Sequence, residues 1–318
     1  PYSTDVETLR KTIAPDLKTP YTDELTLGVI QAISKDFSIA LNFIHKNGKN
    51  MLGALNLNIA KDSQWWVPYT VTDPGDDGQL NTGNEQKLTV YMLRSDAPTN
   101  FIQTANIPDA TRKYWGFNMI FNKRMSNGWM FNGSIALSKA WGNYEHGYLN
   151  YSGSQAFWDP NADINRSGRL EYDRPLIVKL MSTIELPLGF VFSGYFRYYS
   201  GAHFTRQVTV YFPSMVQGYR PRSSSVTIFA EPKRQRDFMP EAYMDLRLEK
   251  TLKIDRFNVG LWVDLFNLFG YNYYLYNQQQ LVGGYIYANG TFARFPRYGQ
   301  PDAVYGTREF AFGARIRF

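Results

Sequence analysis

The sequence contains no cysteine and no long uninterrupted run of apolar residues. Without cysteine, a disulfide framework, thiolate metal ligands and a cysteine nucleophile are excluded. A membrane-spanning helix needs roughly 18 consecutive apolar residues, so a helical membrane protein is excluded as well. The net charge of +6 is spread along 318 residues without a Lys/Arg run, and we therefore expect no nucleic-acid partner.

Aromatic residues, in contrast, are abundant, at 16% of the chain with 23 Tyr and 22 Phe. Strands and membrane interfaces both favour such rings. A barrel strand needs only about ten residues of alternating polarity, so a transmembrane barrel can have the negative mean hydropathy found here.

The segment from Trp129 to Trp141 alternates between two kinds of face. Trp129, Phe131, Gly133, Ile135, Leu137 and Trp141 share one face, and Asn132, Ser134, Ala136 and Ser138 share the other. The two tryptophans are 12 residues apart, which at about 3.3 Å per residue and a tilt near 45° gives a height of about 28 Å. That height is close to the thickness of bilayer hydrocarbon. Lys139 interrupts the apolar face where a long cation can reach lipid headgroups.

Two later segments carry charged residues on one face only. Apolar Phe257, Val259, Leu261, Val263 and Leu265 alternate with Asn258, Gly260, Trp262 and Asp264, and the stretch 244–252 behaves in the same way. In a soluble sandwich the charged face would meet bulk water, whereas in a wide barrel it would line a hydrated lumen. We expect the apolar set to face outward, and Arg256, Asn258 and Asp264 to face inward.

About nine strands are expected in total. The others are Leu25 to Ile33, Phe37 to His45, Tyr114 to Lys123, Leu176 to Leu186, Phe190 to Tyr199 and Glu309 to Phe318. Tight turns alternate with long connections at 46–110, 142–173, 200–238 and 270–306. This asymmetry predicts an all-β, antiparallel transmembrane barrel with short periplasmic turns and long extracellular loops. The first loop is long enough for its own hairpin, which would pair Leu52 to Ile59 with Lys87 to Leu93.

The end of the chain is an alternating strand that finishes with an aromatic residue. It resembles the C-terminal signal by which the barrel assembly machinery recognises outer-membrane proteins. The residues assigned to this signal are Phe310, Phe312, Ile316 and Phe318. The alternative is an ordinary barrel strand that happens to end in Phe.

Val263 to Phe269 reads Val-Asp-Leu-Phe-Asn-Leu-Phe and resembles the strand before the last extracellular loop of TonB-dependent transporters. Tyr172 to Pro175, Gly194 to Tyr198 and Leu137 to Trp141 resemble the Oar-like subgroup of that family. The resemblance implies that residues 1–318 form the C-terminal part of a barrel of about 22 strands. It places the protein in the bacterial outer membrane, surrounded by lipid and lipopolysaccharide, and implies that TonB acts through a plug region absent from this chain.

Two observations independent of that resemblance also lead us to expect a piece of a longer precursor. The chain begins with Pro1, without an initiator Met or a signal peptide. An odd number of strands would leave the two sheet edges able to pair only in parallel, which is rare in bacterial barrels.

Four groups of residues could carry chemistry. Asp73 to Gly78 has the carboxylates of a calcium loop but not its full spacing, which favours an exposed polar turn. His45, His146 and His203 lie in no metal or nucleophile motif. The lumenal charges are Lys179, Glu185, Arg197, Asp245, Arg247, Glu249, Asp264, Arg315 and Arg317, for which a cross-strand ionic network is favoured over solute binding. The loop aromatics are Trp65, Trp66, Tyr148, Tyr151, Phe157, Trp158, Tyr273, Tyr274, Tyr276, Tyr285 and Tyr287. They could equally bind a ligand or pack the loops together.

Three functions are weighed on these grounds. An energy-coupled importer agrees with the alternation and with the family motifs. A diffusive porin or structural barrel agrees with the alternation alone. An enzyme would need a placed nucleophile and base, which the sequence does not show. We therefore predict a non-enzymatic importer without a cofactor or metal, whose solute could be an iron chelate, a cobalamin, a glycan or a peptide.

Overall fold

The computed structural model describes residues 11–144, 157–170, 173–275, 282–301 and 303–317. Within these ranges, the main feature is an antiparallel sheet of ten strands in which the short β10 (Gly168–Arg169) lies beside β9. The other nine follow in chain order: β2 (Tyr21–Ala32), β3 (Phe37–Lys49), β8 (Arg112–Ser126), β9 (Trp129–Gly142), β11 (Leu176–Leu186), β12 (Phe190–Tyr199), β17 (Glu241–Ile254), β18 (Phe257–Phe266) and β23 (Glu309–Arg317). All nine expected strands are confirmed, with small shifts at their ends. We call this sheet the wall.

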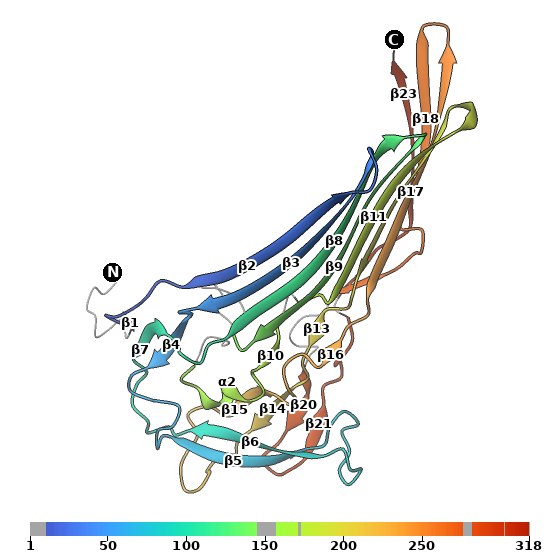
Figure 1. Cartoon of the computed structure of the whole chain (residues 1–318). Helices are drawn as coiled ribbons and strands as arrows, with labels where there is room; N and C mark the ends of the chain where they lie inside the picture. Colours follow the sequence, from blue (N-terminus) through green and yellow to red (C-terminus); the bar gives the residue numbers. More distant parts are fainter. Residues whose placement is uncertain (1–10, 145–156, 171–172, 276–281, 302, 318) are drawn as a thin grey trace, which may run out of the picture.

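Short turns join the strands at one end of the wall, and the long loops gather at the other (Figure 1). Asn127 and Gly128 have φ angles of 51° and 77°, as a two-residue hairpin turn that follows the strand twist requires. Leu188 and Gly189, at 64° and 75°, make the next turn in a similar way. Among the described residues, no helix is long and apolar enough to cross a membrane, and α2 (Pro160–Asp163) has only four residues.

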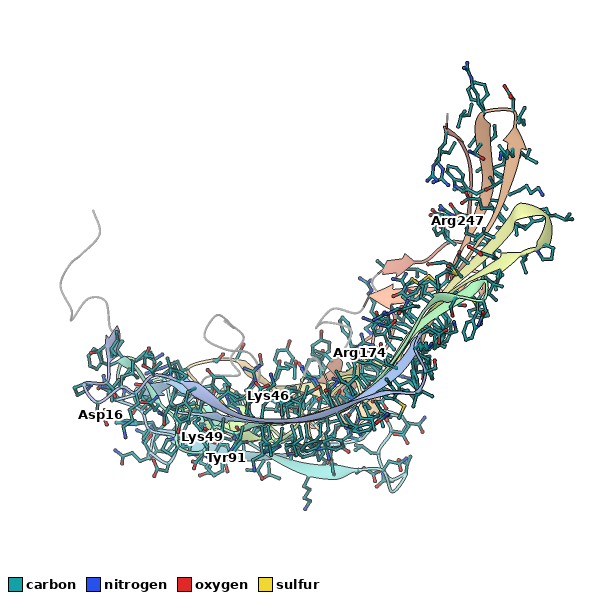
Figure 2. The ribbon with its side chains drawn as sticks, turned by 45° about the horizontal axis from the view of Figure 1, so that its top comes forward. Asp16, Lys46, Lys49, Tyr91, Arg174 and Arg247 are labelled. Atoms are coloured by element: carbon teal, nitrogen blue, oxygen red, sulfur yellow. The ribbon has the colours of Figure 1, made fainter. Side chains whose placement is uncertain are left out.

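The wall is a single curved layer, and Figure 2 shows Arg247 on its concave side. Because Arg247 pairs with Asp264, alternation turns Phe257, Leu261 and their apolar neighbours to the convex side, as expected. Leu261 is exposed, and the other four apolar residues of that set are half-buried rather than covered by a second layer. The inward direction predicted for Arg256 is wrong. Arg256 lies in the turn, and its guanidinium is 5.2 Å from the ring centre of the outward-facing Phe257. The turn ends the alternation from which an inward direction was predicted.

The four long loops, joined by the short strand that precedes the first wall strand, fold together into a second region, which we call the loop cap. Its strands are β1 (Lys11–Ile13), β4 (Leu52–Asn56), β5 (Trp66–Asp73), β6 (Gln86–Leu93), β7 (Ile102–Asn106), β13 (His203–Phe204), β14 (Gln207–Tyr211), β15 (Ser225–Phe229), β16 (Arg236–Asp237), β19 (Tyr273–Leu275), β20 (Val282–Ile286), β21 (Phe292–Arg294) and β22 (Ala303–Tyr305). The expected pairing of 52–59 with 87–93 is wrong, because β4 pairs with β7 and β6 pairs with β5. Two strands absent from the expectation provide these partners.

The water-excluded core of the protein lies in the loop cap. The largest buried apolar cluster consists of Val71, Leu88, Val90, Val208, Val210, Ile228, Ala230 and Ile286. These residues come from β5, β6, β14, β15, β20 and the position after β15, that is, from three different long loops. The hairpin β5–β6 therefore packs on one face of the sheet β15-β14-β20-β21.

Candidate functional site

The concave face of the last three wall strands carries two cross-strand ion pairs. Arg247 Nε and Nη2 donate to the two carboxylate oxygens of Asp264 at 2.5 and 2.8 Å. Arg315 Nη2 donates to Glu249 Oε1 at 2.8 Å. Trp262 lies between the pairs, with its ring centre 5.4 Å from the Arg247 guanidinium and 5.9 Å from that of Arg315. The predicted ionic network is confirmed here.

Farther along the same face, cations lie over rings instead of beside carboxylates. The Arg197 guanidinium is 4.7 Å from the ring centre of Tyr243 and 6.0 Å from that of Tyr195, and Lys179 lies 5.8 Å from Tyr199. Asp245 accepts a hydrogen bond from the backbone N–H of Asn267 at 2.8 Å. Within the described ranges Lys179, Arg197 and Asp245 form no ion pair, so the ionic prediction is wrong for these three. Lys179 is directly opposite Arg197, and tyrosines are opposite Arg197 and Asp245 on the neighbouring strands. The concave face is polar and aromatic, as the lining of a hydrated passage would be.

A buried ion pair holds the loop cap together. Arg206 Nη1 and Nη2 donate to Asp73 at 2.7 and 2.5 Å, and the two side chains are 3% and 0% exposed. Gln86 Nε2 donates to the same carboxylate at 2.9 Å. Burial alone would raise the pKa of Asp73, but hydrogen bonds from Arg206 and Gln86 outweigh it and hold this pKa below the usual 3.8. Residues far apart in sequence thus make one charged, fully bonded contact.

The carboxylates of segment 73–78, which resembles a calcium loop, have partners within the protein. Asp73 and Pro74 are buried, so the expectation of an exposed turn is wrong for its first half and holds for Asp76 and Asp77. Asp76 pairs with Arg236 at 2.7 Å, and Asp77 accepts from the backbone N–H of Gln79 at 3.0 Å. No group of three or more His, Asp or Glu suited to a metal occurs among the described residues. The carboxylates of this loop bond to protein groups.

His203 is buried at the base of the loop cap. Its Nε2 is 2.7 Å from Arg169 Nη1 and 3.3 Å from Asp173 Oδ2, and its Nδ1 contacts Asp237. Asp173 also accepts from the backbone N–H of Ala140 in β9 at 2.7 Å, which ties the cap to the wall. These contacts join the cap to the wall, which supports a structural role for His203. His45 lies exposed on the wall, and His146 lies outside the described residues.

Several loop aromatics pack the loops against one another. Trp66 and Trp158 are 6.0 Å apart, and buried Phe157 stacks on Tyr144 at 6.4 Å. Others form a partly open group, in which Tyr211 lies 5.3 Å from Tyr287 and 6.1 Å from Tyr285. Some loop aromatics therefore pack the loops together, and others are open enough to contact a ligand. Tyr148, Tyr151 and Tyr276 lie outside the described residues.

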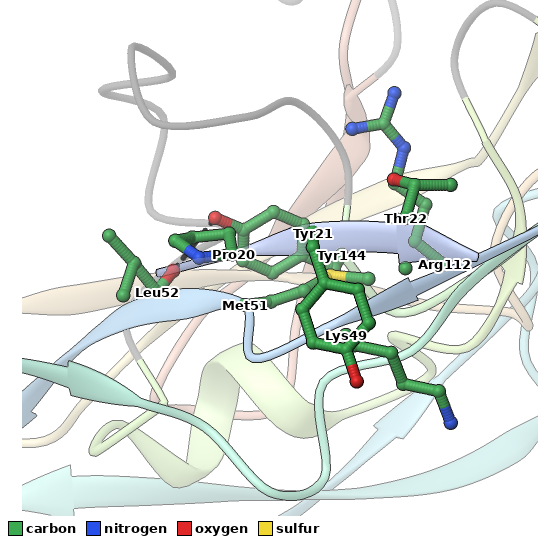
Figure 3. Close-up of a pocket in the computed structure, with 9 residues that line it drawn as sticks. Pro20, Tyr21, Thr22, Lys49, Met51, Leu52, Arg112 and Tyr144 are labelled. Carbon is green, nitrogen blue, oxygen red and sulfur yellow. Dashed lines mark hydrogen bonds between the residues drawn. The ribbon is translucent and has the colours of Figure 1, made fainter. Parts of the chain in front are cut away.

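A pocket of about 270 Å³ lies where the loop ends of β2, β3 and β8 meet the cap (Figure 3). It is lined by Pro20, Tyr21, Thr22, Gly48, Lys49, Met51, Leu52, Arg112 and Tyr144. Tyr144 Oη donates to the carbonyl of Leu52 at 2.7 Å, and burial raises the pKa of Tyr144. The phenol is therefore neutral at physiological pH, and the pocket combines apolar walls with two cations at its rim.

Sequence reasoning missed the arginines of the cap and Tyr211. Arg206 and Arg236 occupy loop positions where no periodicity or motif singles them out. The partner of Arg206 lies 133 residues away, and Arg236 joins Glu231, five residues earlier, to Asp76, 160 residues earlier. No local signal could have shown the two distant pairings.

Comparison with known proteins agrees with this architecture. Residues 2–209 match the protein family described as "Outer membrane beta barrel domain". No curated protein sequence matches the chain. The outer-membrane transporter YddB from Escherichia coli is a structural match with 16% identity and a TM-score of 0.45, over 94% of this chain and 33% of that one.

Two further solved structures match at a similar level. The ferripyoverdine receptor of Pseudomonas aeruginosa has 11% identity and a TM-score of 0.46, over 94% of this chain and 27% of the receptor. The FrpB iron transporter from Neisseria meningitidis has 11% identity and a TM-score of 0.43, over 96% and 32%. This chain thus spans about a third or less of each of the three proteins. The single-layer wall with its polar concave face, together with the family match over most of its length, shows that the chain belongs to the outer membrane β-barrel domain family and is a protein of the bacterial outer membrane.

Proposed function

We propose that this chain forms the C-terminal part of the barrel of a TonB-dependent importer, with the plug outside residues 1–318. The observation that carries the proposal is the combination of a wide polar wall with loops that fold into a cap with its own buried apolar core. A hydrated passage needs the first, and a specific receptor surface needs the second. The partly open group of Tyr211, Tyr285 and Tyr287 provides rings for a ligand with a flat face.

A diffusive porin is the second candidate, because it would use the same polar wall. The two candidates differ in whether the lumen is blocked at rest. The test is the single-channel conductance of the full-length protein in a planar lipid bilayer. A plugged importer shows no stable open-pore conductance until its plug domain is deleted. A steady conductance from the intact protein would overturn the importer and support the porin.

Energy coupling is tested separately in cells. Cysteines introduced upstream of this chain, in the segment expected to contact TonB, should form a disulfide-linked product with a cysteine-bearing TonB. The full-length protein with the same substitution in an extracellular loop serves as the control. Absence of the product, in cells where the barrel is assembled, would contradict TonB dependence while leaving the outer-membrane wall intact.

A further inference from the structure

Three lysines lie on the convex face of the wall near its loop end. Lys139 of β9 is opposite Trp115 of β8, and Lys113 of β8 is opposite Trp141 of β9. Lys49 of β3 shares this face, two positions beyond the residue that pairs with Lys113. Lys49 and Lys113 are exposed, and Lys139 is half-buried. Cations thus occur on the face that otherwise carries the apolar residues.

The short turns show how depth in the membrane runs across the strands. Phe37 at the start of β3 pairs with Lys123, but β8 continues to Ser126 before its turn. In the same way, Trp129 at the start of β9 pairs with Ile184, and β11 continues beyond it. Each step across a long loop therefore moves the periplasmic rim by about two residues, whereas strands joined by a short turn end level, with Ser126 opposite Trp129. On average the rim moves by about one residue per strand, as strand tilt in a barrel requires. Residues at one depth are diagonal neighbours and not directly paired ones.

The three lysines follow this diagonal. Lys113 is two residues nearer the turn than the position opposite Lys49, and Lys139 is two residues nearer the turn than Trp141, which is opposite Lys113. Because the rim moves by only about one residue per strand, the three lysines lie within about two residues of a common depth. Lys139 is ten residues from Trp129 at the turn end, which is roughly 25 Å at about 3.3 Å per residue and a tilt of about 40°. This equals the height of the apolar band on such barrels, so the ammonium groups lie at its extracellular boundary.

Their charge is uncompensated. Within the described residues, none of the three has a carboxylate at ion-pair distance, and Lys139 instead lies 4.9 Å from the ring centre of Trp141. Asp23 of β2 is the nearest carboxylate on the convex face, diagonal to Lys49 across the β2–β3 pair. Among the described residues it forms no ion pair with Lys49. Lys113 and Lys139 have no such neighbour in the register.

Two other lysines of the wall do have carboxylate partners. Lys123, on the same convex face at the turn end, pairs with Asp36 at 2.9 Å and lies 4.2 Å from the ring centre of Trp129. Lys46, on the concave face near the loop end, pairs with Glu24 at 3.0 Å. Lys250, on the convex face at the turn end, also has no carboxylate partner among the described residues, but it donates to the carbonyl of Leu188 and lies 4.3 Å from the ring centre of Phe190. The row is distinguished by three cations on neighbouring strands near the outer leaflet, where an anion can be supplied by the surroundings.

We propose that the row Lys49, Lys113 and Lys139, with the rings of Trp115 and Trp141, binds the phosphorylated headgroup of an outer-leaflet glycolipid. Lysines at a membrane surface attract anionic headgroups, and interfacial rings pack on the boundary between headgroup and acyl chains. The row holds one or more glycolipid phosphates against three neighbouring strands. This surface is separate from the solute path and does not depend on the proposed import.

The test is native mass spectrometry of the detergent-solubilised full-length protein with added bis-phosphorylated lipid A. The variant is Lys113→Gln with Lys139→Gln, and the matched control is Lys46→Gln. Two lysines at a membrane surface predict an affinity about thirtyfold lower for the double variant, with the control unchanged. Lipid A without phosphates should bind the unmodified protein about as weakly as lipid A binds the double variant.

A companion variant, Lys113→Arg with Lys139→Arg, keeps both charges and should retain binding. Heat-modifiability of every variant shows that the barrel is assembled. Unchanged binding by the Gln variant, an equal loss in the Lys46→Gln control, or equal binding of phosphate-free lipid A would each overturn the proposal. Loss in the Arg variant would also overturn it, because the site would then depend on more than charge.

Discussion

The wall and the loop cap use the same period-two alternation but cover their apolar faces differently. On the wall, Phe312 is 79% exposed and Ile316 is 63% exposed. In the cap, Ile286 is 1% exposed and Val208 is fully buried. The wall has one layer and needs lipid against its convex face, whereas the cap has two layers that cover each other. Alternation therefore specifies that a strand has an apolar face, and the tertiary partner specifies what that face meets.

The ion pairs of the two regions differ in the same way. In the wall, Arg247 is 46% exposed beside Asp264 at 9%. In the cap, Arg206 and Asp73 are 3% and 0% exposed. A partly solvated pair contributes little net stability, while breaking a buried pair leaves an uncompensated charge. Loss of an ion pair should therefore cost little stability in the wall and much more in the cap.

The largest effect is expected from the wall's terminal strand. We propose that the end of the chain carries the signal for the assembly machinery and that β23 closes the sheet. Deletion of Phe318 from the full-length protein should then remove most of the assembled barrel while synthesis continues. Phe318 itself lies outside the described residues, and Phe310 and Phe312, earlier in the same strand, are exposed on the convex face. Fractionation and heat-modifiability measure the outcome. Unaltered outer-membrane levels would show that the assembly signal lies elsewhere.

The next effect distinguishes the two ion pairs. Arg206→Met leaves Asp73 buried without its partner and should cost roughly 3–5 kcal/mol of cap stability. Arg315→Met, the control in the wall, should cost less than about 1 kcal/mol because water and lumenal groups can solvate Glu249. Hydrogen exchange of the cap amides in the full-length protein measures both. Similar losses for the two variants would contradict the distinction between the regions.

Two isoleucines test the difference in packing. Ile286→Ala should cost about 2–5 kcal/mol, because it removes buried surface and leaves a cavity in the cap. Ile316→Ala on the convex face should cost at most about 2 kcal/mol, because lipid chains fill the vacated volume and only the transfer contribution is lost. Denaturant unfolding from lipid vesicles, followed separately in each region, gives both values. An equal cost would mean that the convex face is packed against protein.

The smallest effect is a selective response of the cap to acid. The pKa of Asp73 is depressed in the folded state relative to 3.8, so its contribution to stability is present above about pH 4 and is lost as the pH falls through the folded value. Proteolysis of the cap by pepsin should therefore accelerate below pH 4 before the wall unfolds. Asp73→Asn should remove this pH dependence. A cap that resists pepsin equally at pH 4 and pH 2 would be inconsistent with the shift.

Much of the wall could be predicted from the sequence because each strand carries its own signal. The turns at 127–128 and 187–189 are short, so neighbouring strands had to pair in order, and the faces followed from the positions of residues such as Leu261 and Asp264. The loop cap could not be predicted in this way. Its strands are short, and β4 pairs with β7, 50 residues later in the chain, instead of with the nearby β6.

The sequence by itself determined the nine long strands of the wall, their inward and outward faces, and the end at which the loops lie, because period-two alternation and turn length are local properties. Only the tertiary structure decided which loop segments pair, that Arg206 neutralises Asp73, and that Lys49, Lys113 and Lys139 lie together on three neighbouring strands. Those features depend on register and on contacts between distant segments. Their energies arise from burial and charge pairing, which exist only once the strands are side by side.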